Sequence, residues 1–517
     1  MLLSDVPALA AHHAPNVTAI HFAGRSISYD ELHRRCNRLS NALLTLAKPG
    51  ARVAILAENC LEYVDCYYGV PGAGMALTLL NYRLTPRELV YILNDSAPDI
   101  LLTEPKYLAT LKQVLPQLAH QPQRILIGGD DPEWLDYDAV TGGAPSTSPA
   151  VRPQETDLCW LLYTSGTTGL PKGAMLSHRN LMAAVLNSLS GWERSRDDVC
   201  LFTFPQFHVA GYVMPIYHLQ TLPVVLLRNF DPDTLLRSIE DFGVTSTAMA
   251  PTMIAMLLDD PRASRYDLSS LRRIGYGASS MPVTVLKRAS ERWPNVDFST
   301  GFGMTELAGN VMFMGPDDHR RAAIDAPQLL RSVGRQLPLA RVRVIDDRNE
   351  DCPPGVPGEI VIKGDQVLMG YWNNREATAN SFVDGWFRSG DIGEWDENGY
   401  LYVVDRKKDM ILTGGENVYP REVEEVLYQH PAIAEVAVAG RPDQTWGEAV
   451  VAFVVLREGG TVSPEELINF CREQIAGYKK PRHVVFIDAL PKNASGKILK
   501  RELRDRLLRG EFALPSG

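Results

Sequence analysis

The chain has 517 residues, with 52 Lys and Arg against 62 Asp and Glu, so its formal net charge is −10. Hydrophobic residues make up 45% and charged residues 22%, which is typical of a globular protein large enough for more than one domain. The acidic balance argues against general nucleic-acid binding, and no run of about 18 uncharged apolar residues predicts a membrane-spanning helix.

Apolar runs alternate with amphipathic segments over most of the length. Residues 52–59, 99–104, 124–129, 224–230 and 271–278 are strand-like, whereas 233–243 and 282–293 carry apolar residues at helical spacing. This alternation predicts an α/β fold of mainly parallel, helix-covered sheets. We expect residues 1–405 to form this large N-terminal domain.

After about residue 335 the pattern changes to short strands separated by Gly, Pro and Asn turns. It predicts a small β-barrel-like subdomain at the end of the large domain. The charged segment 405–409 then leads into a compact tail of alternating helices and strands. We expect residues 406–517 to form a small, mobile α+β C-terminal domain. From residue 477 on, ten Lys and Arg face four Asp and Glu, which is typical of a solvated helix or of a cationic lid.

The cysteines and the N-terminal residues indicate the cellular compartment of the protein. The seven cysteines are odd in number, widely spaced and without a CxxC pair, so they favour neither a disulfide framework nor a zinc site. Residues 1–15 lack a basic segment before their short apolar stretch and do not resemble a signal peptide. We expect a cytoplasmic protein, and the sequence leaves a homodimer open.

The stretch 158–180 is the most informative. An apolar strand ends in a loop that is rich in glycine and hydroxyl side chains, and a helix-like segment follows from His178. Converging backbone N–H groups, hydroxyls and a lysine are suited to bind phosphate. A Walker A loop needs Ser or Thr directly after its Lys, but Gly173 follows here, which disfavours that class of NTPase. The candidate phosphate-binding residues are Thr164, Ser165, Gly166, Thr167, Thr168, Gly169 and Lys172.

YTSGTTGLPKG (163–173) resembles the signature of the adenylate-forming superfamily, which comprises acyl- and aryl-CoA synthetases, beetle luciferases and the adenylation domains of peptide synthetases. Further blocks follow in the family's order: PQFHVAG (205–211), GYGASSMP (275–282), GFGMTE (301–306), GWFRSGDIG (385–393), DRKKDMILTGGENVYP (405–420) and PKNASGKILKRELR (491–504). Their common order over nearly the whole chain identifies it as a member, most similar to the fatty-acid and aryl-acid CoA ligases.

The resemblance implies two half-reactions. A carboxylate attacks the α-phosphate of ATP to give an acyl-adenylate and pyrophosphate, and a thiol, usually that of coenzyme A, then displaces AMP. It also implies Glu306 as the Mg²⁺ ligand, with Thr305 donating to the α-phosphate. One carboxylate suffices, because Mg²⁺ in such sites keeps waters and substrate phosphates as its other ligands.

The other nucleotide contacts also follow from the resemblance. Phe302 stands where the family places an aromatic ring, often Tyr, against adenine. Asp391 matches the carboxylate that accepts hydrogen bonds from both ribose hydroxyls, and Arg406 matches a second ribose contact. The remaining residues expected around the base are Gly277, Ala278, Ser279 and Gly303.

The resemblance also implies roles for three C-terminal residues, each in one half-reaction or in the change from the first to the second. Lys497 resembles the lysine that reaches both the substrate carboxylate and the α-phosphate during adenylation. It must leave before the thiol can enter, and Lys408 stands at the family's pivot for that rotation. Gly415 matches the glycine that lines the pantetheine channel in the second state. We expect Lys492, Lys500 and Arg501 to be solvated.

The acyl pocket is less well defined. His208 resembles a residue that flanks the pocket during catalysis, with a purely structural histidine as an equal alternative. Small or flexible residues are expected to leave an open, apolar pocket for a fatty, aryl or polycyclic acid. They are Ala210, Gly211, Met214 and Gly301.

The leading hypothesis is an ATP-dependent CoA ligase for a hydrophobic carboxylic acid. A stand-alone adenylation enzyme that loads a carrier-protein thiol is an alternative, and the sequence shows no attached carrier domain. A luciferase-like oxidase is a further alternative, and a non-enzymatic binding protein would have to retain Glu306, Asp391, Arg406 and Lys497 by accident.

Overall fold

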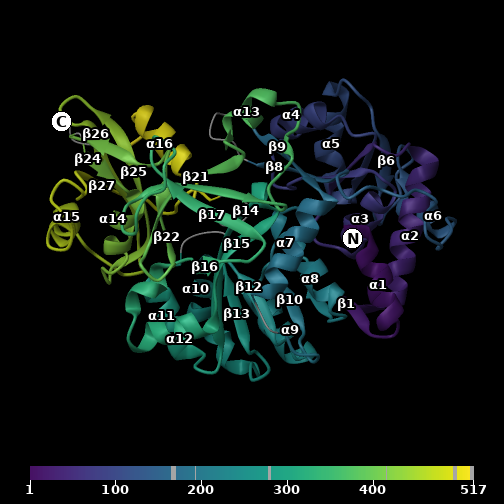
Figure 1. Ribbon diagram of the computed structural model, residues 1–517, viewed down its shortest axis with the longest axis horizontal. Helices are drawn as coiled ribbons and strands as arrows, with labels where there is room; N and C mark the ends of the chain where they lie inside the picture. Colours follow the sequence, from purple (N-terminus) through teal and green to yellow (C-terminus); the bar gives the residue numbers. More distant parts are fainter. Residues whose placement is uncertain (165–169, 192–193, 278–280, 415, 493–497, 513–517) are drawn as a thin grey trace.

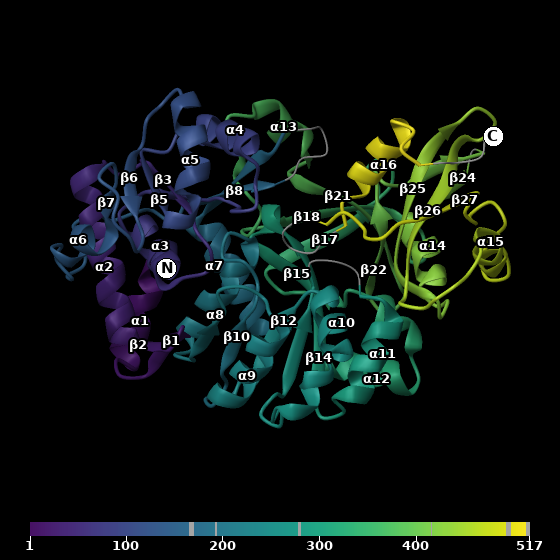
Figure 2. The same ribbon diagram turned by 180° about the vertical axis from the view of Figure 1, so that it is seen from behind.

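The computed structural model describes residues 1–164, 170–191, 194–277, 281–414, 416–492 and 498–512 (Figure 1). Several predicted site residues lie outside these ranges: Ser165, Gly166, Thr167, Thr168, Gly169, Ala278, Ser279, Gly415 and Lys497. The elements of the C-terminal domain lie at one end of the molecule, and α1, α2 and α6 lie at the opposite end (Figure 1 and Figure 2).

Two large sheets form the core of the N-terminal region. The first runs β16 (Arg335–Gln336), β15 (Gly309–Met314), β14 (Asp297–Met304), β13 (Arg273–Tyr276), β12 (Ser246–Met249), β10 (Cys200–Phe202), β11 (Val224–Leu226), β1 (Thr18–Phe22) and β2 (Arg25–Ser28). The second runs β19 (Gly370–Tyr371), β9 (Lys172–Ser177), β8 (Leu158–Thr164), β4 (Ala76–Leu79), β3 (Arg52–Leu56), β5 (Ile100–Thr103), β6 (Gln123–Leu126) and β7 (Leu135–Asp136).

The prediction of mainly parallel sheets is confirmed. Neighbours from β14 to β1 and from β8 to β7 pair in parallel, and antiparallel strands occur toward the edges of both sheets. The central strands are buried on both faces, as expected for continuous apolar runs such as 52–56.

Helices cover both sheets. They are α1 (Val6–His13), α2 (Tyr29–Leu46), α3 (Leu61–Gly72), α4 (Pro86–Ser96), α5 (Leu108–Val114), α6 (Tyr137–Gly142), α7 (His178–Ser190), α8 (Val213–Leu219), α9 (Pro232–Phe242), α10 (Pro251–Asp259), α11 (Val283–Arg292), α12 (Pro316–Ile324) and α13 (Arg375–Asn380). One continuous apolar core contains α3, α7, α8 and strands of both sheets, whereas α9, α10 and α11 bury their apolar faces against the first sheet in a separate core. This layering is the one that alternating strands and helices predict.

The hairpin-rich region forms a third sheet. Its strands pair β17 (Ala340–Ile345), β18 (Gly358–Gly364), β21 (Trp386–Trp395) and β20 (Phe382–Val383), with β22 (Leu401–Arg406) also paired to β21. These pairs are antiparallel, as expected for hairpins. Within the part of the chain that the structure describes, no pair joins the outer strands, so the sheet is open rather than a closed barrel.

The C-terminal domain has its own sheet and two cores. Its strands are β24 (Glu416–Val418), β23 (Ile411–Thr413), β26 (Gly447–Leu456), β25 (Ile433–Asp443) and β27 (His483–Phe486), with helices α14 (Pro420–Leu427), α15 (Pro464–Arg472) and α16 (Lys500–Leu508). The chain passes from one sheet to the other between Arg406 and Ile411. Among the described residues, no helix is long and apolar enough to cross a membrane.

Candidate active site

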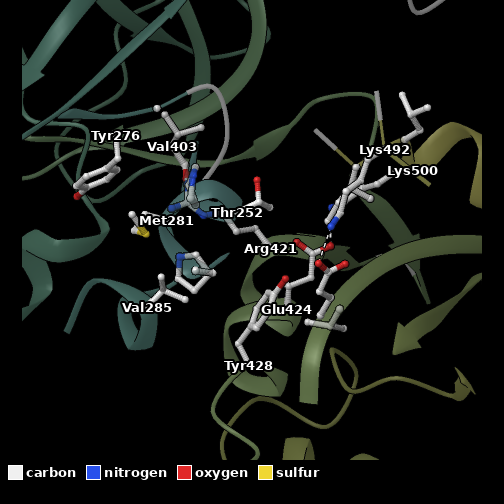
Figure 3. Close-up of a pocket in the computed structure, with 18 of the residues that line it drawn as sticks. Thr252, Tyr276, Met281, Val285, Val403, Arg421, Glu424, Tyr428, Lys492 and Lys500 are labelled. Atoms are coloured by element: carbon white, nitrogen blue, oxygen red, sulfur yellow. Dashed lines mark hydrogen bonds and ion pairs between the residues drawn. The ribbon is translucent and has the colours of Figure 1, made fainter. Parts of the chain in front are cut away.

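A cavity of about 1870 Å³ lies between the N-terminal region and the C-terminal domain (Figure 3). Its walls come from the ends of β13 and β14, from β21 and β22, and from α14 and α16. Residues from separate sequence blocks line it together: Gly277, Gly301, Phe302, Gly303, Asp391, Arg406 and Lys408. The fold therefore brings the predicted base, ribose and hinge residues to one place.

Gly303 stands where two backbones approach closely. A Cβ atom built on Gly303 would lie 2.1 Å from the Gly309 carbonyl oxygen of the paired strand β15. No side chain fits at this distance, so the glycine is required by the strand pairing that shapes this wall.

Asp391 lies on β21 directly opposite Arg406 on β22, at the cavity surface. Asp391 is 4% exposed, and its Oδ1 lies 2.9 Å from Nε of Arg406. A carboxylate at the cavity surface can accept hydrogen bonds from a ligand.

Glu306 lies in the turn that follows β14. Its Oε1 accepts hydrogen bonds from the Thr164 hydroxyl at 3.3 Å and the Tyr371 hydroxyl at 3.1 Å. Burial and the neighbouring carboxylate raise the pKa of Tyr371, so its hydroxyl remains protonated and donates. The Lys172 ammonium lies over the Tyr371 ring, 5.3 Å from its centroid. A carboxylate, two hydroxyls and a cation are thus gathered beside the predicted phosphate loop.

The predicted phosphate loop lies between antiparallel strands. Thr164 ends β8 and pairs with Lys172 at the start of β9, so residues 165–171 connect the two strands. The helix predicted from His178 is α7, which begins only after β9. The N-terminus of this helix therefore does not immediately follow the loop.

The C-terminal wall of the cavity carries cations as well as the carboxylates of Glu424, Glu425, Glu435 and Asp505. Lys492, Lys500, Arg501 and Arg504 all line it. Lys500 is not solvated as predicted, because its Nζ lies 2.7 Å from Glu424 and both side chains are largely covered (Figure 3). Burial lowers the pKa of Lys500, but the carboxylates of Glu424 and Asp405 outweigh it and raise that pKa. Lys492 pairs with Glu435, whereas Arg501 is mostly exposed, as expected.

Polar contacts join α14 to the N-terminal region. The backbone N–H of Arg421 donates to Asp405 at 2.8 Å, and its guanidinium donates to the Val403 carbonyl at 2.6 Å. Glu425 forms an ion pair with Arg331 at 2.6 Å. Lys408 itself is exposed, and it lies between Arg406 and Ile411, where the chain passes from one sheet to the other. Polar contacts thus fix the residues on both sides of the predicted hinge.

The C-terminal domain is oriented so that α16 and the residues just before it face the cavity. Residues 498–501, which follow the segment that contains Lys497, line the cavity. The β23–β24 hairpin around Gly415 contributes no described residue to that lining. Instead, the adjacent Gly414 donates its N–H to the carbonyl of Trp446 at 2.8 Å.

The predicted acyl-pocket residues do not line this cavity, apart from Gly301. Met214 is fully buried in the core, and a Cβ atom on Gly211 would lie 2.2 Å from the Tyr67 hydroxyl oxygen. The open space expected beside Gly211 is therefore filled by Tyr67, which donates to the Gln206 carbonyl. Ala210 is half-buried, and its N–H donates to Nδ1 of His208 at 3.1 Å. That contact supports the structural alternative for His208.

Several neighbours of the site are not among the residues predicted from the sequence. Tyr371 has a signal that could have found it, its place in GYWN (370–373), a short aromatic block between the others. The Glu424–Lys500 pair carries no local signal, because two charged residues on separate helices are ordinarily solvated. Tyr276 belongs to the block 275–282, but an aromatic residue at the end of a strand is ordinarily part of the core.

The comparisons with known proteins agree with this geometry. The family model described as "AMP-binding enzyme" matches residues 8–372, and the one described as "AMP-binding enzyme C-terminal domain" matches residues 422–497. Among curated proteins, the chain is 38% identical to a feruloyl-CoA synthase of Amycolatopsis sp, covering 98% of this chain and 99% of that protein. It is 36% identical to the fatty acid–[acyl-carrier-protein] ligase ScoC of Streptomyces coeruleorubidus, covering 96% and 94%.

A solved structure extends the likeness to three dimensions. The o-succinylbenzoate CoA synthetase of Bacillus subtilis, in complex with its acyl-adenylate intermediate, superposes with a TM-score of 0.84 at 31% identity. The match covers 97% of this chain and 98% of that one, so both the large region and the C-terminal domain have counterparts there.

Proposed function

The chain belongs to the adenylate-forming AMP-binding enzymes, the AMP-forming acid–thiol ligases, and we propose that it activates a hydrophobic carboxylic acid and transfers the acyl group to coenzyme A. The observation that carries this proposal is the convergence of Gly277, Phe302, Asp391 and Arg406 on one cavity, which Ile498, Leu499 and Lys500 also line.

In the first half-reaction, a carboxylate oxygen of the acid attacks the α-phosphorus of ATP and pyrophosphate leaves with the electrons of the broken P–O bond. We assign Asp391 and Arg406 to the ribose, Gly277 and Phe302 to the base, and the loop from Thr164 to Lys172 to the phosphates. Lys497 is assigned to the carboxylate and α-phosphate, where its charge offsets the repulsion between two anions. Ile498, Leu499 and Lys500, which follow Lys497 in the chain, line the same cavity, and this supports the assignment.

The residues around Glu306 fit a magnesium ion. Mg²⁺ prefers oxygen ligands and in phosphate-transfer sites is held by one or two carboxylates plus substrate phosphates. Glu306 supplies such a carboxylate, and Thr164 and Tyr371 orient it by hydrogen bonds. When bound, the ion would neutralise phosphate charge, and Thr305 would donate to the α-phosphate.

Replacing Glu306 by Gln is expected to raise the Mg²⁺ concentration for half-maximal pyrophosphate release by roughly 10- to 100-fold, because the amide keeps the shape but lacks the charge. A Mg²⁺ titration of acid-dependent pyrophosphate release measures this. The matched variant Tyr371→Phe keeps the carboxylate and removes one hydrogen bond, so its shift should be smaller. An unchanged Mg²⁺ dependence in Glu306→Gln would refute the assignment.

In the second half-reaction, a thiol sulfur attacks the acyl carbon of the adenylate and AMP leaves. We propose that the C-terminal domain turns about Lys408 between the two steps, since Lys497 and the thiol need the same space. The turn would break the Arg331–Glu425 pair and the contacts of Arg421, and it would bring the hairpin around Gly415 to the cavity.

A surface beside that hairpin supports coenzyme A as the acceptor. Trp446 is 40% exposed, and the Arg482 guanidinium stacks 4.0 Å from the centroid of its ring. Arg441, Asp443 and Arg482 all lie near His483. An exposed aromatic ring with an arginine stacked on it suits the nucleotide and phosphates of coenzyme A. A carrier-protein thiol is the second candidate acceptor, favoured by the name of the relative ScoC.

Arg482→Ala and Trp446→Ala are expected to raise the KM for coenzyme A by about 10-fold, since each removes a contact to a charged or stacked group. Acid-dependent ATP–pyrophosphate exchange, which needs no thiol, should stay within about twofold of wild type. Arg509→Ala, another exposed arginine of the same domain, is the control. If thioester formation with coenzyme A is unaffected, this surface does not bind the acceptor.

The proposal as a whole is tested with a panel of fatty, aryl and polycyclic acids. Each acid is incubated with ATP and Mg²⁺ and with coenzyme A, a carrier protein that bears a pantetheine thiol, or no acceptor, and thioesters are detected by mass. We expect a coenzyme A thioester from one class of hydrophobic acid. If a thioester forms only on the carrier protein, the acceptor is the carrier-protein thiol and not coenzyme A. Formation of adenylate without any thioester would rule out both acceptors.

A further inference from the structure

Tyr276 lies at the wall of the cavity where the nucleotide base is proposed to bind. It ends β13, directly before Gly277, and its ring contributes to the lining although the residue is only 6% exposed. In Figure 3 its hydroxyl points away from the other labelled side chains, so the cavity meets the ring and not its polar end.

The Tyr276 hydroxyl is bound to His319 of α12. Its oxygen lies 2.8 Å from Nε2 of His319, and the two rings meet edge to face with centroids 5.6 Å apart. The other ring nitrogen, Nδ1, lies 2.8 Å from the Gly315 carbonyl oxygen. A carbonyl can only accept, so Nδ1 carries the proton, and in the neutral ring Nε2 accepts from Tyr276. His319 is 8% exposed and burial lowers its pKa, which favours that neutral ring.

The helix that carries His319 is itself fixed. Asp318 accepts a hydrogen bond from the Tyr400 hydroxyl at 2.6 Å, and Arg321 donates to the same hydroxyl at 3.1 Å. Arg320 pairs with Asp297 at the start of β14. The helix that carries the imidazole is therefore anchored to Tyr400 and to β14.

Tyr276 and Phe302 come from the paired strands β13 and β14 and both line the cavity, so this wall carries two aromatic side chains. Tyr276 pairs with Thr300 on β14, whose hydroxyl donates to the Tyr276 carbonyl at 2.9 Å, and Phe302 follows two residues later. Flat aromatic walls bind a base by stacking, and stacking depends on ring orientation. The cavity is the open side of this wall, because Tyr276 is otherwise enclosed by the core around β13.

We propose that His319 is a positioning residue for nucleotide binding. It accepts a hydrogen bond from the Tyr276 hydroxyl and thereby holds the tyrosine ring flat against the base site. This rests on the proposed function, which places the base at this wall. Without the acceptor, the buried hydroxyl is unsatisfied and turns to the cavity, where it occupies the space of the base. His319 touches neither the nucleotide nor the reacting atoms.

Direct binding of AMP and of tripolyphosphate, measured by calorimetry on the full chain, tests this without turnover. His319→Leu is expected to weaken AMP binding by about 10-fold, the effect of leaving one buried donor unpaired. Tripolyphosphate lacks a base, so its Kd should stay within about twofold. His319→Gln can place an oxygen near Nε2 and should recover most of the AMP affinity. The double variant Tyr276→Phe/His319→Leu removes both polar groups and should also recover it.

Each outcome of these measurements either supports or overturns the positioning role of His319. Unchanged AMP affinity in a folded His319→Leu variant, or equal weakening of both ligands, overturns the positioning role. If that variant does not fold, His319→Gln and the double variant decide: recovery of AMP affinity in both supports the role, and loss in the double variant overturns it. Failure of the proposed function would instead show as wild-type protein that binds AMP but forms no adenylate with any acid.

Discussion

Lys497→Ala is expected to lower acid-dependent pyrophosphate release by roughly 100- to 1000-fold, the loss seen when one group that stabilises a charged transition state is removed. The reason is electrostatic: an anionic carboxylate must approach the α-phosphate, and the lysine charge offsets their repulsion. Thioester formation from a supplied acyl-adenylate should remain within about threefold of wild type. Quenched-flow measurement of each half-reaction separately checks both statements.

Lys492→Ala is the matched control for this variant. Lys492 lies in the same cationic segment and lines the same cavity, but it pairs with Glu435. Its substitution should change pyrophosphate release by less than about fivefold, as expected for a partly exposed ion pair. Wild-type pyrophosphate release in Lys497→Ala, or an equal loss in both variants, would contradict the specific role of Lys497.

Gly415→Leu should have the opposite profile: adenylate forms at a rate near that of wild type, while thioester formation falls by at least about 100-fold. A leucine side chain would fill the channel through which the thiol is proposed to reach the acyl carbon, and a small misplacement of reacting groups is already costly. The measurement is single-turnover thioester formation from preformed adenylate at saturating coenzyme A.

Two further variants sharpen this experiment. Gly415→Ala adds one methyl group and should give an intermediate rate. Gly477→Leu places the same side chain elsewhere in the C-terminal domain, at a glycine where an added Cβ atom would have no neighbour within 4 Å, and should leave both half-reactions intact. Loss of both half-reactions in Gly415→Leu would indicate damage to the fold, whereas thioester formation at the wild-type rate would reject the channel assignment.

Much of the architecture follows from patterns that are local in the sequence. Apolar runs such as 52–56 become buried parallel strands because a sheet covered on both faces excludes polar residues. The phosphate-binding block is recognisable because phosphate chemistry requires glycine and hydroxyls in a fixed order. The strand β9 after that block is not predicted, since residues 172–177 are few and continue directly from the glycine-rich loop.

The interior of the site depends on contacts between distant segments. From the sequence, a glycine at position 211 suggests free space beside it, yet Tyr67 of α3 occupies that space. Only the packing of α3 beside the turn before α8 reveals this. Lys500 has the sequence context of a solvated cation, yet α14 supplies Glu424 and the domain covers both. Such pairings have no period or spacing, so they cannot be found without the fold. The sequence therefore predicts the class of reaction better than it predicts which acid is the substrate.

The central claim is that the acid is activated by attack of its own oxygen on the α-phosphate. The most direct test uses the best acid of the panel with both carboxylate oxygens replaced by ¹⁸O, together with ATP, Mg²⁺ and coenzyme A, and mass analysis of all products. We expect one ¹⁸O in AMP, the other in the thioester carbonyl, and unlabelled pyrophosphate. Unlabelled AMP, or label in inorganic phosphate together with ADP, would contradict the claim.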